Sequence, residues 1–148
     1  FHGDYASIDE DGLWYLHGRV DDVIKVAGHR FSSTDIEAVL AMHEAVAESA
    51  VIGLPDEVKG ERIVAYVVLK PSYRKMHDLL RDELRRHVEN TVGKIARPDS
   101  IYFVDDLPKT RSGKVMRRLV RAKALGMQVG DVSSIENIAS LAMLDNPY

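Results

Sequence analysis

Hydrophobic and polar residues follow one another along the chain with spacings that predict a mixture of strands and helices. The clearest strand is 63–69, where seven consecutive apolar residues, three of them valine, end before Pro71. Three further β-compatible runs are predicted to be strands: 23–26, 45–54 and 101–104. A hairpin or wide loop over 57–62 is expected to join the two longest strands.

Two segments have the period of a helix with one apolar face. In 77–92 this stripe holds Leu80, Leu84, Val88 and Thr91. The second segment, 115–125, predicts a basic helix whose inward side chains are Met116, Leu119 and Val120.

A helix is also predicted to begin near Thr34. Thr34 and Glu37 have the spacing of a capping box, in which the Thr caps the helix and the Glu reaches back. The residues that then share one face are Ile36, Val39, Leu40 and His43.

At the N-terminal end, 5–8 and 13–16 flank an Asp-Gly pair, which predicts a β-hairpin. The whole pattern predicts an α+β fold: a small mixed or antiparallel sheet flanked by helices, with an N-terminal β-hairpin. We divide the chain by residue number. The divisions are a hairpin segment (1–17), a connector (18–22), a main domain (23–125) and a tail (126–148), with one possible short helix from Ser134.

The composition is that of an ordinary globular protein of 148 residues and net charge −3, so no global attraction to nucleic acid or acidic membranes is implied. There is no cysteine, which excludes disulfides and thiolate metal sites. The longest apolar run is too short to cross a bilayer, and the cytoplasm is the expected compartment. The chain begins with Phe1 and reads like mid-protein sequence, so we expect it to be part of a longer protein.

The most informative segment is the loop from Pro108 to Lys114, with sequence PKTRSGK. It places Lys114 behind a glycine, where a basic helix is predicted to begin. This layout can present one ammonium group to an anion, and such a charge at about 4 Å from a phosphate contributes roughly 4 kcal/mol at an effective dielectric of 20. An arbitrary lysine in such a loop would simply be solvated.

A second run, from Gly18 to Arg30, lies far upstream (GRVDDVIKVAGHR). The two runs in this order resemble the C-terminal domain of AMP-forming acyl-CoA synthetases, most closely the acetyl-CoA synthetase type. The resemblance covers Phe1 to about Val129, and the tail from Gly130 also resembles members that use short-chain acids.

The resemblance implies a two-step reaction. A carboxylate attacks the α-phosphate of ATP and releases pyrophosphate, and the thiol of coenzyme A then displaces AMP from the acyl-adenylate. Lys114 takes the role of the lysine required for the first step, where it lies between the two anions. Acetylation would remove its charge, so lysine acetyltransferases and deacetylases are implied as partners.

The other site residues follow from the same resemblance. Asp4 and Arg19 match the two contacts to the ribose of the nucleotide, and Arg30 matches an arginine near the ATP phosphates. Asp21 matches the hinge about which the domain rotates between the two steps. The CoA-facing loop would contain Lys25, Ala27 and Gly28, the last allowing close approach of backbone to the pantetheine arm.

One position departs from the family. Acetyl-type relatives have an arginine that contacts the CoA phosphates where Glu89 stands here, and Arg85, Arg86 or Lys94 are the nearby replacements. The six histidines show no metal-ligand spacing, so no metal site is expected on this chain. Mg²⁺ would accompany ATP, held by the phosphates and by a large N-terminal domain that the resemblance implies. Alone, this chain is expected to make no acyl-CoA.

Other interpretations stay open. Within the superfamily, the chain could be the small domain of a medium-chain acyl-CoA ligase or of a peptide-synthetase adenylation domain. A different class is a nucleic-acid-binding module that uses the run of Lys and Arg over 109–123, although no recognised nucleic-acid motif accompanies that run.

Overall fold

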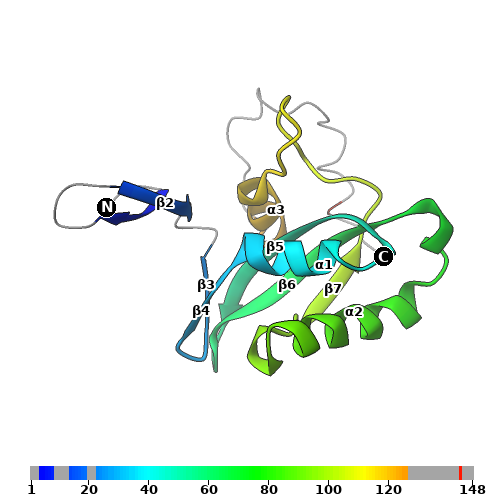
Figure 1. Ribbon diagram of the computed structural model, residues 1–148, viewed down its shortest axis with the longest axis horizontal. Helices are drawn as coiled ribbons and strands as arrows, with labels where there is room; N and C mark the ends of the chain where they lie inside the picture. The colour runs from blue at the N-terminus through cyan, green and yellow to red at the C-terminus, as the bar shows by residue number, and fades with distance from the viewer. Residues whose placement is uncertain (1–3, 9–13, 20–22, 127–143, 145–148) are drawn as a thin grey trace.

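The computed structural model describes residues 4–8, 14–19, 23–126 and 144. It contains a two-stranded N-terminal hairpin and a five-stranded sheet with helices on both faces (Figure 1). The α+β class with a small mixed sheet is therefore confirmed. In chain order the elements are β1 (Asp4–Ile8), β2 (Trp14–Arg19), β3 (Val23–Val26), β4 (His29–Ser32), α1 (Ser33–Ala41), β5 (Val46–Asp56), β6 (Gly60–Leu69), η2 (Pro71–Tyr73), α2 (His77–Thr91), η3 (Lys94–Ala96), β7 (Ser100–Phe103) and α3 (Arg117–Ala124).

The N-terminal hairpin pairs β1 with β2 in antiparallel register, as the sequence predicts. β2 runs to Arg19, past the predicted end at Leu16, so it includes the start of the predicted connector. The turn residues 9–13 lie outside the described residues.

The main sheet has the strand order β4-β3-β6-β5, and β7 lies parallel to β6 along the edge of β6 that faces β3. β5 and β6 form the longest antiparallel pair, with β5 at the edge of the sheet. The hairpin or wide loop predicted over 57–62 is a hairpin whose turn is short, because β5 ends at Asp56 and β6 begins at Gly60. Only the β6–β7 pairing is parallel among the described strands, which makes the sheet mixed.

The apolar run in β6 is explained by burial on both faces. Alternate residues of the strand point to opposite sides of the sheet, and each side has its own hydrophobic core. One set (Ile63, Ala65, Val67 and Leu69) packs with α1 and α2, and the other (Val64, Tyr66 and Val68) packs on the side of α3.

α2 buries Leu80, Leu84 and Val88, which follow one another at intervals of four residues as predicted. The fourth predicted member of the stripe, Thr91, is exposed, so that prediction is wrong. Thr91 closes the last turn of the helix, where its hydroxyl donates to the carbonyl of His87 at 2.8 Å.

α1 begins at Ser33, with Ser32 at its N-cap position, and no side chain caps the helix. The predicted capping box is therefore wrong. The Thr34 hydroxyl lies 2.7 Å from that of Ser32, and the carboxylate of Glu37 turns away to a different partner described below. The apolar face is correct in that Ile36 and Leu40 are buried.

α3 begins at Arg117, two residues later than predicted, because the preceding residues belong to a hairpin. Leu119 and Val120 are buried as expected, while Met116 is half-buried at the helix start. The possible helix from Ser134 lies outside the described residues.

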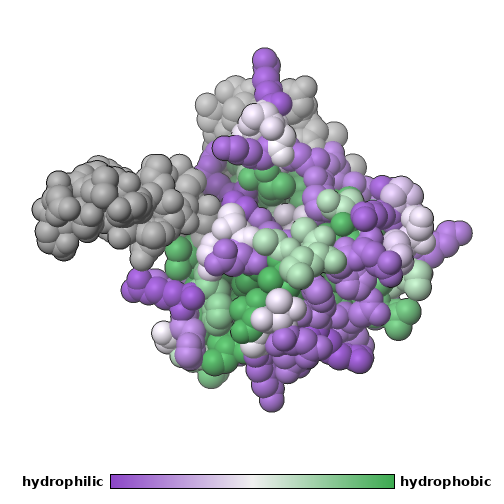
Figure 2. Space-filling model, viewed as in Figure 1, coloured by the Kyte–Doolittle hydropathy of each residue, from purple (hydrophilic) through white to green (hydrophobic). Residues whose placement is uncertain are grey.

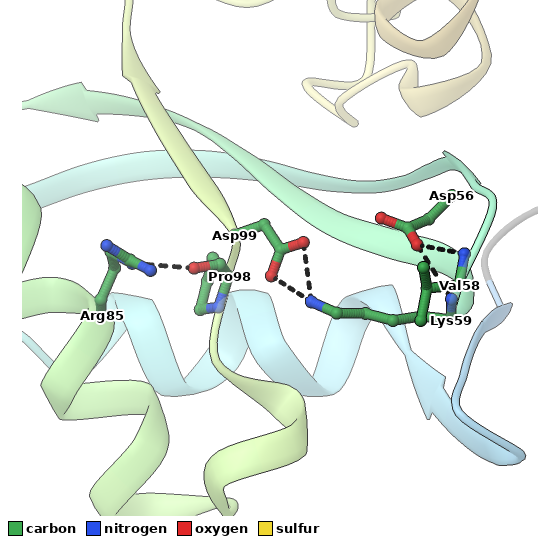
Figure 3. A network of polar contacts seen from close by, with 6 residues as sticks. All are labelled: Asp56, Val58, Lys59, Arg85, Pro98 and Asp99. Atoms are coloured by element: carbon green, nitrogen blue, oxygen red, sulfur yellow. Dashed lines mark hydrogen bonds and ion pairs between the residues drawn. The ribbon is translucent and has the colours of Figure 1, made fainter.

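The turn between β5 and β6 is held by the side chain of Asp56 (Figure 3). Its Oδ1 accepts hydrogen bonds from the backbone N–H groups of Val58 at 2.9 Å and Lys59 at 2.8 Å. These two bonds, from Lys59 first, lower the pKa of Asp56 below its ordinary value of 3.8. The ionised carboxylate therefore stabilises the turn.

We expect the contribution of Asp56 to depend on pH. Because its folded pKa lies below the unfolded one, the contribution is present above pH 3.8 and is lost as the pH falls through the folded pKa. An Asp56→Asn variant keeps the acceptor oxygen without the charge. Urea unfolding should find the variant less stable at pH 7, with a smaller difference at pH 3, and a difference that does not change with pH would contradict this assignment.

Candidate functional site

The segment from Lys109 to Val115 forms a narrow hairpin between β7 and α3. These two residues pair as an isolated antiparallel bridge. Inside it, the N–H of Thr110 donates to the carbonyl of Lys114 at 2.9 Å, and the N–H of Gly113 donates to the carbonyl of Thr110 at 2.9 Å. Gly113 has φ +87°, the left-handed conformation that ends a three-residue hairpin loop and that glycine adopts without steric cost.

The shape of this loop is fixed by its own polar atoms. The Thr110 hydroxyl accepts a hydrogen bond from the N–H of Lys114 at 3.2 Å and lies 2.9 Å from the hydroxyl of Ser112. At the base, the N–H of Met116 donates to the carbonyl of Pro108 at 2.8 Å. The sequence motif includes these residues, but it does not reveal that the Thr110 hydroxyl connects the two sides of the loop. Only the structure shows this role.

The hairpin projects away from the sheet, and hydrophilic residues gather at the end of this projection (Figures 1 and 2). Lys114 is exposed there, and its ammonium forms no ion pair or hydrogen bond with any residue in the described part of the chain. The charge of Lys114 is thus available to a ligand.

Lys109, five residues earlier, has the opposite environment. Its ammonium contacts Glu48 of β5 at 2.9 Å and Asp106 at 3.0 Å. Burial works to lower the pKa of Lys109, but the hydrogen bonds to the two carboxylates outweigh it and raise the pKa above its ordinary value. Lys109 is therefore a fixed cation that ties one leg of the hairpin to the sheet.

Two arginines of α3 are also used inside the domain. Arg117 forms a bidentate ion pair with Glu37 of α1. Arg121 donates from Nε to the carbonyl of Gly53 at 2.8 Å, and its Nη2 lies 3.9 Å from Glu61. A good part of the basic run over 109–123 thus holds the fold together and does not form one open cationic surface.

The predicted ribose contacts lie on the N-terminal hairpin. Asp4 in β1 and Arg19 in β2 are direct cross-strand partners, so the register places these two sequence positions opposite each other. The predicted hinge residue, Asp21, lies outside the described residues.

The predicted CoA-facing loop is a two-residue turn between β3 and β4, a strand that the sequence analysis did not predict. Ala27 and Gly28 form the turn with φ of +50° and +84°, the pattern of a type I′ hairpin turn. The N–H of Ala27 donates to the carbonyl of Lys59 at 2.8 Å, and a Cβ at Gly28 would meet nothing within 4 Å. Lys25 and Arg30 are cross-strand partners behind the turn, both exposed.

A cavity of about 330 Å³ opens beside this turn. Its wall includes Ala27, Ile95 and the exposed Lys94. Lys59 contributes a further cation, whose ammonium contacts both carboxylate oxygens of Asp99 at 2.9 Å (Figure 3). Asp99 also lines the cavity and neutralises Lys59, so the cavity combines apolar surface with the positive charges of Lys94 and Arg97 next to the turn.

The structure also shows the surroundings of Glu89, the position that departs from the family, and of its three predicted replacements. Glu89 contacts Arg97 at 3.5 Å, and Arg97 lines the same cavity. Arg85 donates from Nε to the carbonyl of Pro98 at 2.9 Å, which commits it to a structural bond (Figure 3). Arg86 is exposed on α2 and is not among the residues that line the cavity. Of the three predicted replacements, Lys94 is the one at the cavity.

The described residues contain no group of three His, Cys, Asp or Glu side chains placed to hold a metal ion. They also contain no helix that is long and apolar enough to span a membrane.

Comparison with known proteins agrees with this geometry. The family model described as AMP-binding enzyme C-terminal domain matches residues 35–114. The chain is 53% identical over 139 residues to an acetyl-coenzyme A synthetase of Methanothrix thermoacetophila, covering 94% of this chain and 21% of that protein. It is 47% identical over 141 residues to a 3-hydroxypropionyl-coenzyme A synthetase of Sulfurisphaera tokodaii, covering 95% of this chain and 21% of that protein.

Among solved structures, an acyl-CoA synthetase of Brucella canis superposes with a TM-score of 0.69 at 40% identity, covering 84% of this chain and 23% of that one. The chain thus spans about a fifth of the length of the curated relatives it matches.

The contrast between the two lysines can be measured directly. We expect limited treatment with acetic anhydride to acetylate Lys114 several-fold faster than Lys109, because only an accessible, unprotonated amine reacts and Lys109 is ion-paired with a raised pKa. Peptide mass spectrometry reports both rates. In concentrated urea the two rates should converge, and equal rates in the native protein would contradict the described exposure of Lys114.

Proposed function

The chain belongs to the AMP-binding enzyme C-terminal domain family, and we propose that it is the mobile C-terminal domain of an ATP-dependent, AMP-forming short-chain acyl-CoA synthetase. The observation that carries the proposal is the exposed Lys114 at the end of a hairpin whose first cation, Lys109, is bound within the domain. Such a hairpin can deliver the ammonium of Lys114 to a ligand outside the domain.

In the first step, an oxygen of the carboxylate attacks the α-phosphorus of ATP, and pyrophosphate leaves. Two anions must approach each other, so a cation between them reduces their repulsion and orients the attack. Lys114 would supply this cation. Its value is greatest where charge develops in the transition state, at a site from which the large N-terminal domain excludes water.

In the second step, the sulfur of coenzyme A attacks the acyl carbonyl, and AMP leaves. We propose that rotation about Asp21 then brings the turn at Ala27 and Gly28 to the active site. The open space at Gly28 and the adjoining cavity support this role, because a pantetheine arm needs close approach to backbone and its phosphates need cations. Lys94 would take a phosphate in place of the family arginine that Glu89 replaces.

The remaining parts of the reaction would come from the large N-terminal domain of the full enzyme. ATP would arrive with Mg²⁺ held mainly by its phosphates. Asp4 and Arg19, opposite each other in the hairpin, would hold the ribose, and Arg30 would lie near the ATP phosphates in the first conformation. A lysine acetyltransferase could silence Lys114 by removing its charge, and a deacetylase could restore it.

The acid used is proposed to be short. The two relatives described above carry the names of acetyl- and 3-hydroxypropionyl-coenzyme A synthetases. The sequence of the tail from Gly130 also resembles that of members that use short-chain acids. A panel of acetate, propionate, 3-hydroxypropionate and a medium-chain acid, assayed with the full enzyme, would identify it.

The proposed function requires Lys114→Ala to separate the two steps. In the full enzyme, ATP–pyrophosphate exchange should fall at least about 100-fold, the scale of losing one charge-stabilising group. CoA transfer to a preformed acyl-adenylate should remain within about twofold, because that step uses the other face of the domain. The matched control is Lys75→Ala, another exposed lysine, which should affect neither step. Equal loss of both steps, or of neither, would refute the assignment.

The second proposed site predicts a different separation. Lys94→Ala should raise the KM for CoA about fivefold, as expected for roughly 1 kcal/mol from an exposed ionic contact, and leave ATP–pyrophosphate exchange unchanged. Arg86→Ala serves as the control, since Arg86 is exposed but not among the residues lining the cavity. A rise with Arg86→Ala and none with Lys94→Ala would place the CoA phosphates elsewhere.

A further inference from the structure

The second leg of the Lys114 hairpin ends at Arg117, whose guanidinium is bound by Glu37 of α1. Nε of Arg117 donates to Oε2 of Glu37 at 2.6 Å, and Nη2 contacts Oε1. The two side chains are only 14% and 19% exposed, for Glu37 and Arg117 respectively, and eighty residues separate them in the sequence. A paired contact of this kind fixes the direction of the guanidinium as well as its position.

Glu37 is itself held in place by the sheet. Its Oε2 also accepts a hydrogen bond from the N–H of Val51 in β5 at 2.8 Å. One carboxylate therefore connects α1, the edge strand β5 and the start of α3. Because the carboxylate is bound on two sides, it provides a rigid support for the arginine.

This support lies close to the functional lysine along the chain. Arg117 directly follows Met116, whose N–H closes the base of the hairpin on Pro108. The first leg is anchored in parallel, through Lys109 and Glu48 of β5. Both legs of the hairpin thus end in cations that are bound by acidic residues of the main domain, while Lys114 at the far end remains unbound within the described part of the chain.

We propose that Glu37, acting through Arg117, is a positioning residue for Lys114: it sets the direction in which the hairpin leaves the domain, so that the ammonium reaches the reacting anions. This role rests on the proposed function of Lys114. A displacement of about 1 Å of a group that orients two reactants costs on the order of 100-fold in rate. Loss of the anchor at the foot of the hairpin should therefore slow adenylation, although no group that touches substrate has changed.

The test uses Glu37→Gln in the full enzyme. Glutamine has the same shape and can still accept the N–H of Val51, but it lacks the charge that binds Arg117. We expect ATP–pyrophosphate exchange to fall about 10- to 100-fold in kcat, with CoA transfer to preformed acyl-adenylate within about twofold. The control is Arg121→Gln, which loosens the other end of the α3 anchor at Gly53 and Glu61 and should leave both steps nearly unchanged.

A second measurement does not depend on activity. In Glu37→Gln, hydrogen exchange of the backbone amides over 109–116 should accelerate, while exchange in α2 and β6 stays as in the parent protein. The double variant Glu37→Gln with Arg117→Met should lose no more adenylation than the more affected single variant, because the two side chains act as one unit.

The outcomes distinguish this role from general stability. If both half-reactions fall together and exchange accelerates throughout the domain, Glu37 only stabilises the fold and the proposal is wrong. Unchanged exchange over 109–116, or a loss in Arg121→Gln equal to that in Glu37→Gln, would also overturn it. Failure of the proposed function is recognised separately, because Lys114→Ala would then leave adenylation intact whatever the exchange of the hairpin shows.

Discussion

The burial of β6 on both faces is the constraint on which the rest of the structure depends. Its alternate residues supply two cores, one with α1 and α2 and one on the side of α3. A strand whose two faces are both apolar must be shielded from solvent on both sides. The three helices are therefore divided between the two faces of the sheet. The hairpin between β7 and α3 connects a strand in the sheet to the helix on the α3 side, and this connection brings its base to the edge at β5.

The charges near this edge show how one cation is kept available among many. Lys109, Arg117 and Arg121 each find a carboxylate or a carbonyl of the main domain. These contacts hold the two legs of the hairpin against the sheet, and hydrogen bonds of Thr110, Ser112 and Gly113 fix the shape of the loop beyond them. Positive charge next to Lys114 is thus neutralised at the base, and the charge at the tip is left for a ligand.

The sequence predicts the elements that local pattern dictates. The unbroken apolar run in β6 predicts a buried strand, and the spacing of Leu80, Leu84 and Val88 predicts one buried face of a helix. The structure confirms both. β4 was missed because Ala27 is not a typical residue for a turn with positive φ, although Gly28 is. The left-handed conformation of Ala27 costs roughly 1 kcal/mol or more. Ala27 adopts it because the pairing of β3 with β4 and the hydrogen bond to the carbonyl of Lys59 hold it there.

Of the candidate site, the resemblance supplied the identity of Lys114, but not what holds it. Glu37 has the spacing of a helix cap, and only the approach of α3 to the same edge of the sheet gives it a stronger partner in Arg117. No pattern local to residues 34–37 carries that information, because the partner lies eighty residues away.

The way in which β5 is covered also bears on how the domain behaves in solution. β5 is a long strand at the edge of the sheet, and a bare edge of this kind offers unpaired backbone groups on which the strand of another molecule can add. Here the outward N–H of Val51 and carbonyl of Gly53 are occupied by Glu37 and Arg121. The same side chains that hold the basic helix in place therefore also cover part of the edge on which a strand of another molecule could add.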